Sequence, residues 1–244
     1  GIPATAFSQS VPLSVAELAE FHCPAYIRSL YDGSIDAKAM RRIGFPWTAQ
    51  LFQRSLCSLG GTLQTAQAAL ETGIALHLSG GYHHAFYAEG SGFCLFNDLV
   101  VAARTMLRRG LDKILLVDLD VHQGDGSAAM LADEPRIISF SVHCEKNFPY
   151  RKQPSDWDIG LPPDCTEQQY LEAVQQSLHT LLHWHKPDLV IYDAGVDIHQ
   201  NDELGLLNIS TPAVFQRDYL VLQSCVQQSI PVAAVIGGGY QRNI

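Results

Sequence analysis

The stretch ILLVDLDVHQGDG, residues 114–126, passes from a continuous apolar run into a cluster of polar side chains. An apolar run of this length is typical of a strand that is buried on both faces of a parallel sheet. Asp118, Asp120, His122 and Asp125 then follow within eight positions. Because alternate side chains of an extended strand share a face, the first three should project together from the carboxyl edge of the sheet. Ligands bind at this edge in open parallel sheets, so the stretch predicts a binding site.

The rest of the chain alternates between short apolar runs and segments with helical periodicity. Further strands are expected within residues 73–81, 136–143, 188–195 and 232–239. Helices are expected within residues 62–71, 97–109, 167–184 and 213–228. The segment from Pro149 to Pro163 is expected to be a long loop within the domain. This alternation predicts an α/β fold in which helices cover both faces of a central, mostly parallel β-sheet.

Composition limits the class of protein. The chain has 244 residues, of which 47% are hydrophobic and 17% charged, so it can form one large core and does not have a disordered composition. The formal net charge is -9, and no basic run is longer than Arg108–Arg109. These features argue against nucleic acid or an anionic membrane as the main partner. A cationic substrate suits this charge.

The cysteines and the apolar runs indicate the compartment. The six cysteines lie far apart without a C-x-x-C pair, and the start of the chain lacks the pattern of a secretory signal. No apolar stretch approaches the ~20 residues needed to cross a bilayer. We therefore expect reduced thiols in a cytoplasmic protein, or a nuclear one if the source is eukaryotic.

The acids after the apolar run favour a metal ion. A lone D-x-D-x-H would also fit a capping or turn cluster, but buried acids are costly without a counter-charge, which a divalent cation supplies. Two carboxylates and a neutral imidazole around Zn²⁺ give a neutral site with an open position, as in catalytic zinc centres. The second carboxylate should come from another strand end, and YDAGVD offers Asp193 and Asp197. Asp197 is the better candidate because it lies beyond the strand, whereas Asp193 could equally be a structural acid bonded to backbone N–H groups.

Two adjacent histidines, His83 and His84, follow the first predicted strand and a glycine pair. A lone histidine is more often a core residue than a catalyst, but two in tandem beside a metal motif favour acid–base chemistry. Each imidazole needs an acid to fix its tautomer and tune its pKa. Asp118 and Asp125 remain for this purpose once the metal takes Asp120.

Tyr240 comes directly after three glycines at the end of the last predicted strand. The glycines do not have the G-x-G-x-x-G spacing of a phosphate loop. They would instead let the backbone approach a cleft closely. The phenol of Tyr240 is therefore expected to lie near the metal as a donor to an oxyanion.

These residues together resemble the zinc-dependent histone deacetylase family, and most closely its class IV and related bacterial branch. The resemblance spans nearly the whole chain. Its motifs occur in the family's order: RRIGFPW (41–47), GGYHHAF (80–86), GFCLFND (92–98), VDLDVHQGDG (117–126), FSVHCEKNFPYRK (140–152), YDAGVD (192–197) and GGGY (237–240). The resemblance implies one catalytic domain, residues 1–244, with the three-layer arginase/deacetylase-like α/β fold.

The resemblance also implies roles for individual residues. The zinc ligands, one ion per chain, would be Asp120, His122 and Asp197. The catalytic groups would be His83 held by Asp118, His84 held by Asp125, and Tyr240, which polarises the carbonyl. The walls of a narrow acyl-lysine tunnel would be Gly92, Phe93 and Phe148, although ordinary core packing would account equally well for the two aromatic side chains. A potassium ion near the first acid would involve Asp118 and Ser141.

The chain departs from the family pattern in several places. It begins inside that pattern, without the first strand, and stops before the usual last helix. Val196 stands where many relatives have alanine, which would narrow the pocket slightly. No rim acid of the better-known classes can be matched, and Asp32, the only candidate, fits a solvated turn better.

The expected reaction is metal-assisted hydrolysis of an acylated amine, with His84 as the base and His83 as its electrostatic partner. The substrate would be acyl-lysine in a protein or peptide, most simply acetyl-lysine, or an acylated polyamine or small amine. One alternative is an arginase-type ureohydrolase with two Mn²⁺ ions, but the later acids are spaced D-x-x-x-D where that class needs a second D-x-D. Another is a catalytically idle module that binds acyl-lysine, whose usual mark would be a lost ligand or a lost tyrosine. The acyl-chain length and the oligomeric state do not follow from the sequence.

Overall fold

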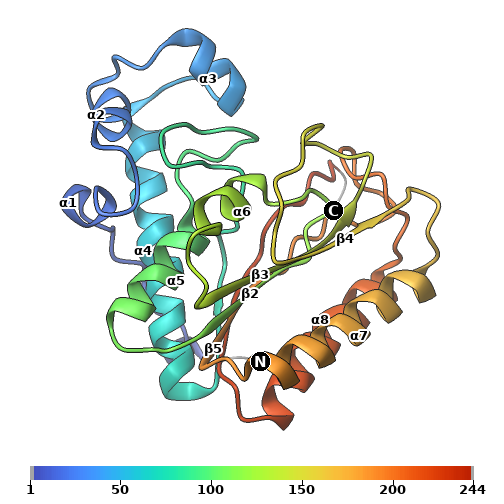
Figure 1. Cartoon of the computed structure of the whole chain (residues 1–244). Coiled ribbons are helices and arrows are strands. Elements are labelled where there is room, and N and C mark those ends of the chain that lie inside the picture. The colour runs from blue at the N-terminus through green and yellow to red at the C-terminus, as the bar shows by residue number, and fades with distance from the viewer. Residues whose placement is uncertain (1–2, 243–244) are drawn as a thin grey trace.

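The computed structural model describes residues 3–242, which form a six-stranded sheet in which every pair of neighbouring strands is parallel (Figure 1). The strand order is β1-β6-β5-β2-β3-β4. The strands are β1 (Ile74–His77), β2 (Ile114–Asp118), β3 (Ile137–Cys144), β4 (Trp157–Leu161), β5 (Leu189–Asp193) and β6 (Val232–Val235). The order places β2 and β5, which end in Asp118 and Asp193, beside each other at the centre of the sheet.

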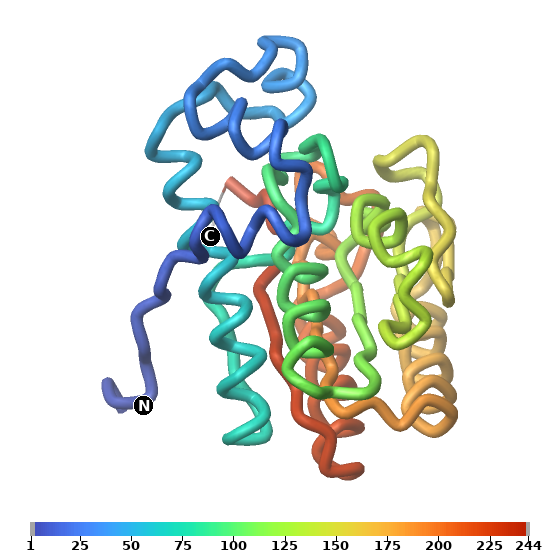
Figure 2. Tube along the Cα trace, turned by 60° about the vertical axis from the view of Figure 1, so that its left-hand side comes forward, coloured from blue at the N-terminus to red at the C-terminus, as the bar shows by residue number. Residues whose placement is uncertain are grey.

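Helices cover both faces of this sheet (Figure 1). On one face lie α4 (Ala49–Thr72), α5 (Asp98–Arg108) and α6 (Asp125–Leu131). On the other face lie α7 (Glu167–His185) and α8 (Thr211–Gln227). The N-terminal part adds η1 (Ala4–Ala6), α1 (Val15–Leu18), α2 (Pro24–Asp32) and α3 (Ala37–Ile43). The segment before α1 runs beside α4, where the Leu13 backbone N–H donates to the Leu56 carbonyl oxygen (Figure 2). This arrangement confirms the predicted three-layer α/β fold.

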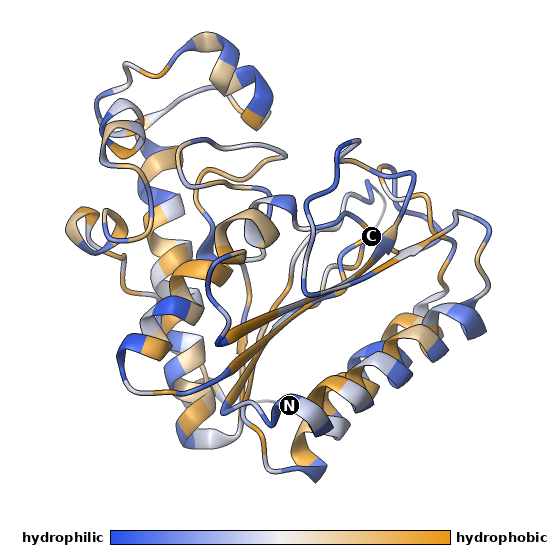
Figure 3. Cartoon of the chain, viewed as in Figure 1, coloured by the Kyte–Doolittle hydropathy of each residue, from blue (hydrophilic) through white to orange (hydrophobic). Residues whose placement is uncertain are grey.

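Two apolar clusters, one on each side of the sheet, hold the layers together (Figure 3). Along β2, Ile114 and Leu116 belong to the cluster under α4 and α5, and Leu115 and Val117 belong to the cluster under α7 and α8. All four side chains are buried, which explains why the strand is a continuous apolar run in the sequence. Burying each such side chain contributes roughly 1.5–3 kcal/mol, so both faces of β2 are strongly specified.

Four strands lie inside the runs that the sequence predicted, and β3 ends one residue beyond its run, at Cys144. The expected loop from Pro149 to Pro163 is wrong in part. It contains β4, which pairs with the edge of β3 in the register Phe140↔Trp157. Because β4 is an edge strand, its residues are only partly buried in alternation and give a weak apolar signal. The helix expected at 62–71 is the second half of α4, which begins earlier because the Thr48 hydroxyl accepts a hydrogen bond from the Leu51 N–H.

The loops that follow the central strands meet at the carboxyl edge of the sheet. The Leu119 N–H donates to the Asp193 carbonyl oxygen (3.1 Å), which extends the β2–β5 pairing by one residue. The Ala194 N–H donates in the same way to the Val235 carbonyl oxygen (3.0 Å) at the end of β6. The loops after β2, β5 and β6 therefore leave the sheet side by side. Among the described helices, none combines the length and the apolar character needed to span a membrane.

Candidate metal centre and active site

Three side chains from two of these loops form the candidate metal centre. The Nδ1 atom of His122 lies 3.0 Å from Asp120 Oδ1 and 3.0 Å from Asp197 Oδ2, and all three side chains are buried. The second oxygen of each acid accepts a backbone hydrogen bond. Gly238 N–H donates to Asp120 Oδ2 (3.0 Å) and Val121 N–H donates to Asp197 Oδ1 (2.9 Å). The carboxylates are therefore oriented by the main chain of neighbouring loops.

This set of donors fits a divalent cation such as Zn²⁺. Ligand bonds of about 2.0–2.2 Å place neighbouring donor atoms of a tetrahedral site about 3.3–3.6 Å apart, a few tenths of an ångström more than the two separations of 3.0 Å found here. Burial and then the charge of Asp120 raise the pKa of Asp197 to about 7. Burial lowers the pKa of His122, but its hydrogen bonds to both acids outweigh this and raise it to about 9. Protons thus occupy the centre in the metal-free protein, and a divalent cation would replace them.

The two histidines lie beside this centre, each paired with an acid. His83 Nδ1 is 2.8 Å from Asp118 Oδ2, and His84 Nδ1 is 2.7 Å from Asp125 Oδ1. The ring centroids are 4.1 Å apart, and both histidines are buried. The Nε2 atom of His83 lies 3.9 Å from Asp120 Oδ1. The structure therefore brings together the pairs that the sequence predicted, one acid per imidazole.

The two imidazoles differ in their electrostatic surroundings. Burial opposes charge on His83, but Asp118 and Asp120 outweigh it and raise the pKa of His83 well above its usual value. Burial and then the charge of His83 lower the pKa of His84 to about 4. His83 is thus suited to carry a proton, and His84 is suited to accept one at neutral pH.

The main chain of the loop that carries both histidines is hydrogen-bonded by residues to which the sequence analysis assigned no role. Asp98, the first residue of α5, accepts hydrogen bonds from the N–H groups of Gly81 (3.1 Å) and Tyr82 (2.7 Å). Asn97 donates through Nδ2 to the Ala85 carbonyl oxygen (3.1 Å). His22 contacts the Phe86 carbonyl oxygen through Nδ1 (3.1 Å). These residues contact main chain. In the sequence, Asn97 and Asp98 could be noticed only as the end of the GFCLFND motif and the start of a predicted helix.

Tyr240 lies at the wall of the same site. Its ring centroid is 6.4 Å from that of His122 and 5.8 Å from that of Phe93. Its N–H donates to Asp202 Oδ2 (2.7 Å), a contact that the sequence did not indicate. Burial and then the charge of Asp120 raise the pKa of the phenol, so that it keeps its proton and can donate it in a hydrogen bond.

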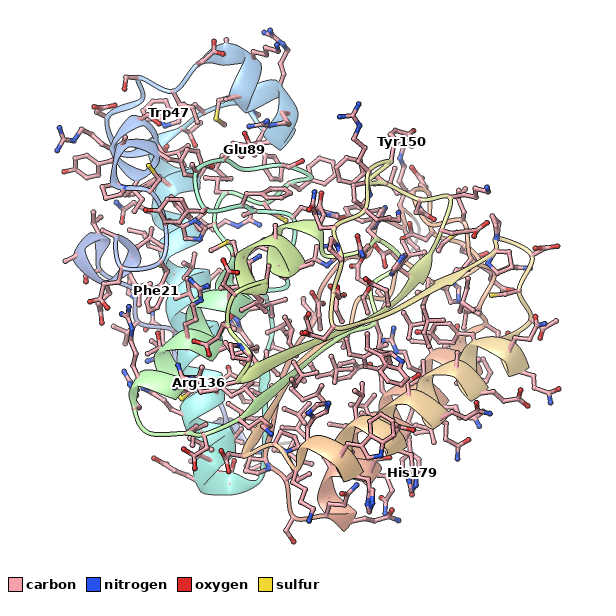
Figure 4. The ribbon with its side chains drawn as sticks, viewed as in Figure 1. Phe21, Trp47, Glu89, Arg136, Tyr150 and His179 are labelled. Carbon is pink, nitrogen blue, oxygen red and sulfur yellow. The ribbon has the colours of Figure 1, made fainter. Side chains whose placement is uncertain are left out.

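Two cavities lead to these residues. One of about 310 Å³ is lined by His83, Asp120 and the glycines after β1 and β6. The other, of about 380 Å³, is lined by His122, Phe148 and Tyr150, of which Tyr150 lies exposed at the surface (Figure 4). Both cavities share four residues: His84, Gly92, Phe93 and Tyr240. The residues expected to form an acyl-lysine tunnel all line the second cavity, where Phe93 is 38% and Phe148 37% exposed.

The remaining predicted residues have mixed outcomes. Asp193 does not bond to backbone N–H groups as the structural interpretation required. It is 0% exposed, neither oxygen has a hydrogen-bond partner among residues 3–242, and Oδ2 is 3.9 Å from His83 Nδ1. Ser141 lies opposite Asp118 in the β2–β3 register, and its Oγ contacts His143. Asp32 is the exposed last residue of α2, where a solvated turn was expected, and it accepts a hydrogen bond from the Ser34 N–H.

Comparison with known proteins agrees with this geometry. A family model described as "Histone deacetylase domain" matches residues 2–244. An uncharacterized protein of Picosynechococcus is 51% identical over 91% of this chain and 75% of its own length. Histone deacetylase 2 of Arabidopsis thaliana is 32% identical over 76% of this chain, and the acetoin utilization protein AcuC of Staphylococcus aureus is 26% identical over 78%. The chain spans about half the length of these last two proteins, 49% and 52%.

Solved structures show the same fold. A crystal structure of an HDAC homolog from Aquifex aeolicus is 24% identical, with a TM-score of 0.84 over 98% of this chain and 69% of that one. A second structure, of an HDAC homolog complexed with SAHA, gives a TM-score of 0.85 with the same identity and coverage. Because the family model matches essentially the whole chain and the fold agrees, this protein belongs to the histone deacetylase family.

Proposed function

We propose that the protein is a zinc-dependent deacylase that hydrolyses the amide bond between an acyl group and the amine of lysine or of a related cationic compound. The observation that carries this proposal is the convergence of one ligand set, two acid-paired imidazoles and a phenol on shared cavities. Asp120, His122 and Asp197 supply the ligand atoms. His84 and Tyr240 line both cavities beside them.

In the proposed mechanism, Asp120, His122 and Asp197 would hold Zn²⁺, which would supply Lewis acidity to activate the acyl carbonyl and the attacking water. His84 accepts the proton of the attacking water, because its neutral form is favoured and Asp125 orients its ring through Nδ1. The proton on His83 balances the neighbouring acids, and either imidazole can protonate the departing amine. The Tyr240 hydroxyl donates a hydrogen bond to the oxygen that becomes negative, which is worth about 3 kcal/mol.

The alternatives receive less support from the residues. A binuclear ureohydrolase would need a second metal at His83, Asp118 and Asp193, whose ligand atoms also lie within 4.8 Å of one another. However, His83 Nδ1 is engaged by Asp118 at 2.8 Å, and a nitrogen that donates a hydrogen bond there has no lone pair for a metal. An idle binding module is not favoured, because the ligand set and Tyr240 are intact.

The substrate would be acyl-lysine in a protein or peptide, or an acylated polyamine or small amine. A solved structure of the same fold is complexed with SAHA, which supports a ligand site in this fold. The six cysteines are free thiols in the described part of the chain, which supports a reducing compartment such as the cytoplasm. The register of Asp118 with Ser141 supports a potassium ion near these two residues.

The test combines metal analysis with a substrate panel. Zinc-loaded protein is assayed on peptides that carry acetyl-lysine or longer acyl-lysines, and on acylpolyamines of increasing acyl length. Hydrolysis of at least one member, with one zinc per chain and loss of both zinc and activity in Asp197→Asn, is the expected result. Tyr219→Phe is the matched control for Tyr240→Phe, because Tyr219 is 56% exposed on α8 and lines neither cavity. A zinc-loaded protein that hydrolyses no member of the panel would contradict the deacylase and favour a binding module.

A further inference from the structure

Arg217 of α8 is a buried cation that the proposed mechanism does not use. Its side chain is 0% exposed and it is the largest fully buried side chain of the described residues. Its one acidic partner is the next residue, Asp218, whose Oδ1 accepts from Arg217 Nε at 2.9 Å. A guanidinium is almost never fully buried without several hydrogen bonds, so its other contacts indicate its purpose.

Those contacts are three backbone carbonyl oxygens on the loops that carry the metal ligands. Arg217 Nη1 donates to Gly195 O (2.6 Å) and to Leu119 O (3.2 Å), and Nη2 donates to Ala194 O (3.0 Å). Leu119 is the residue before the ligand Asp120. Ala194 and Gly195 lead directly to Asp197.

These contacts lie just beyond the ends of β2 and β5. The β2–β5 register ends with the pair Asp118↔Asp193, and one further backbone bond follows, from Leu119 N–H to Asp193 O. Beyond it the two loops separate, and their carbonyl oxygens need other donors. One planar guanidinium from α8, on the opposite side of the sheet from α4, satisfies three of them and spans both loops (Figure 1).

Arginine is suited to this task and lysine is not. The guanidinium has five N–H donors in a fixed fork, whereas an ammonium is a compact charge with three donors on a flexible stem. The Nε atom of the same guanidinium donates to Asp218 Oδ1. This oxygen also accepts a hydrogen bond from the Tyr192 hydroxyl at 2.6 Å. A lysine could reach one loop but could not hold both at a set separation.

We propose that Arg217 is a positioning residue of the metal centre, which sets the separation between the loop of Asp120 and His122 and the loop of Asp197. It lines neither cavity among the described residues, so it acts through the main chain and does not touch the substrate. The inference rests on the proposed metal site. Residues that orient metal ligands typically change metal affinity by 10–100-fold when they are replaced.

The experiment measures metal affinity separately from stability. Zinc affinity is measured by competition with a chromogenic chelator for the wild type, Arg217→Lys and Val221→Ala, and the Co²⁺ absorption spectrum is recorded for each. Val221 is the matched control, since it is buried on the same helix about one turn further on and its side chain has no polar atom that could donate to a loop carbonyl. Arg217→Lys should bind zinc 10–100-fold more weakly with an altered Co²⁺ spectrum, and excess zinc should restore its activity. Val221→Ala should lose stability but keep wild-type zinc affinity.

The outcomes separate this inference from the proposed function. Unchanged zinc affinity in Arg217→Lys, or an equal loss in Val221→Ala, overturns the positioning role while the deacylase proposal stands. A wild type that binds zinc but hydrolyses nothing overturns the deacylase, and the affinities still decide the role of Arg217. A wild type that binds no zinc overturns both. If Arg217→Lys does not fold, Arg217→Ala is measured instead in millimolar guanidinium and, as the control, in millimolar ammonium. Guanidinium should restore zinc affinity and ammonium should not. Equal zinc affinities in the two salts overturn the inference.

Discussion

His22 joins the N-terminal part of the chain to the loop of the two histidines, and this contact predicts a specific loss of stability in acid. Its Nδ1 contacts the Phe86 carbonyl oxygen at 3.1 Å, and its Nε2 accepts a hydrogen bond from the Asn97 N–H at 3.1 Å. Burial lowers the pKa of His22 to about 4, and its contacts with the backbone carbonyls only partly oppose this. A proton on Nε2 would also place a second donor against the Asn97 N–H.

The magnitude follows from the difference between the folded and unfolded pKa values. An unfolded histidine titrates near ~6.5, so between that pH and about 4 the unfolded chain binds more protons than the folded chain. The stabilisation from neutral His22 is complete above pH ~6.5 and is lost as the pH falls through this window. The free energy of unfolding should fall by about 2 kcal/mol between pH 7 and pH 5, and by about 3 kcal/mol at pH 4, from this residue alone.

The assay compares denaturant unfolding of the wild type and His22→Gln across this pH range. Glutamine keeps a donor and an acceptor but does not titrate, and contributions from all other groups cancel in the difference. The advantage of the wild type should shrink by about 2 kcal/mol from pH 7 to pH 5. His179→Gln, exposed on α7 (Figure 4), is the control and should change stability little at either pH. A wild-type advantage that stays constant from pH 7 to pH 4 would refute the reasoning.

Three further predictions concern the site. Tyr240→Phe should lower kcat by about 100-fold or more without changing zinc content, measured by steady-state kinetics and metal analysis, and equal activity would remove the phenol from the mechanism. Zinc at a hundredfold excess over its Kd should raise the free energy of unfolding of the wild type by about 2.7 kcal/mol, and Asp197→Asn should show no such rise in thermal or denaturant unfolding. Gly81→Ala should destabilise the fold by more than about 1 kcal/mol, because φ is +88° and the new Cβ would lie 2.6 Å from Gly237 Cα. Gly110→Ala is the control, because φ is +106° and nothing lies within 4 Å of the new Cβ, so this variant has the backbone strain without the collision. An equal loss of Tm in both variants would show that the collision contributes nothing.

The sheet was predictable where both faces of a strand are buried. Every residue of β2 and of β5 is buried, so each appears in the sequence as an unbroken apolar run. The edge strand β4 has only half-buried residues at alternate positions, and its signal could not be distinguished from a loop. The first half of α4 was missed because it is stabilised by packing with the N-terminal helices, which are distant contacts, and because the local Thr48 cap that begins it was not recognised.

The candidate site was predictable to the extent that chemistry determines residue type. Asp120, His122 and Asp197 are recognisable because polar side chains directly follow buried strands. Asp98 and Arg217 could not be found in this way, because they bind main-chain groups, which any residue offers. Asp193 as a structural acid bonded to backbone N–H groups, one of the two interpretations left open, does not agree with the structure, because neither of its oxygens has a hydrogen-bond partner among residues 3–242.

The glycines around the acids have a consequence for how this enzyme family can diversify. A methyl group added at Gly124, Gly195 or Gly238 would collide with Asp118 or Asp120. The backbone beneath these acids therefore has no room for a side chain at these three positions. The outer cavity is walled instead by large side chains, including Phe148 and Leu206, which can change size without touching that backbone. In the proposed deacylase, selection for a new acyl group can therefore change the side chains of the outer cavity without altering the backbone beneath the ligands.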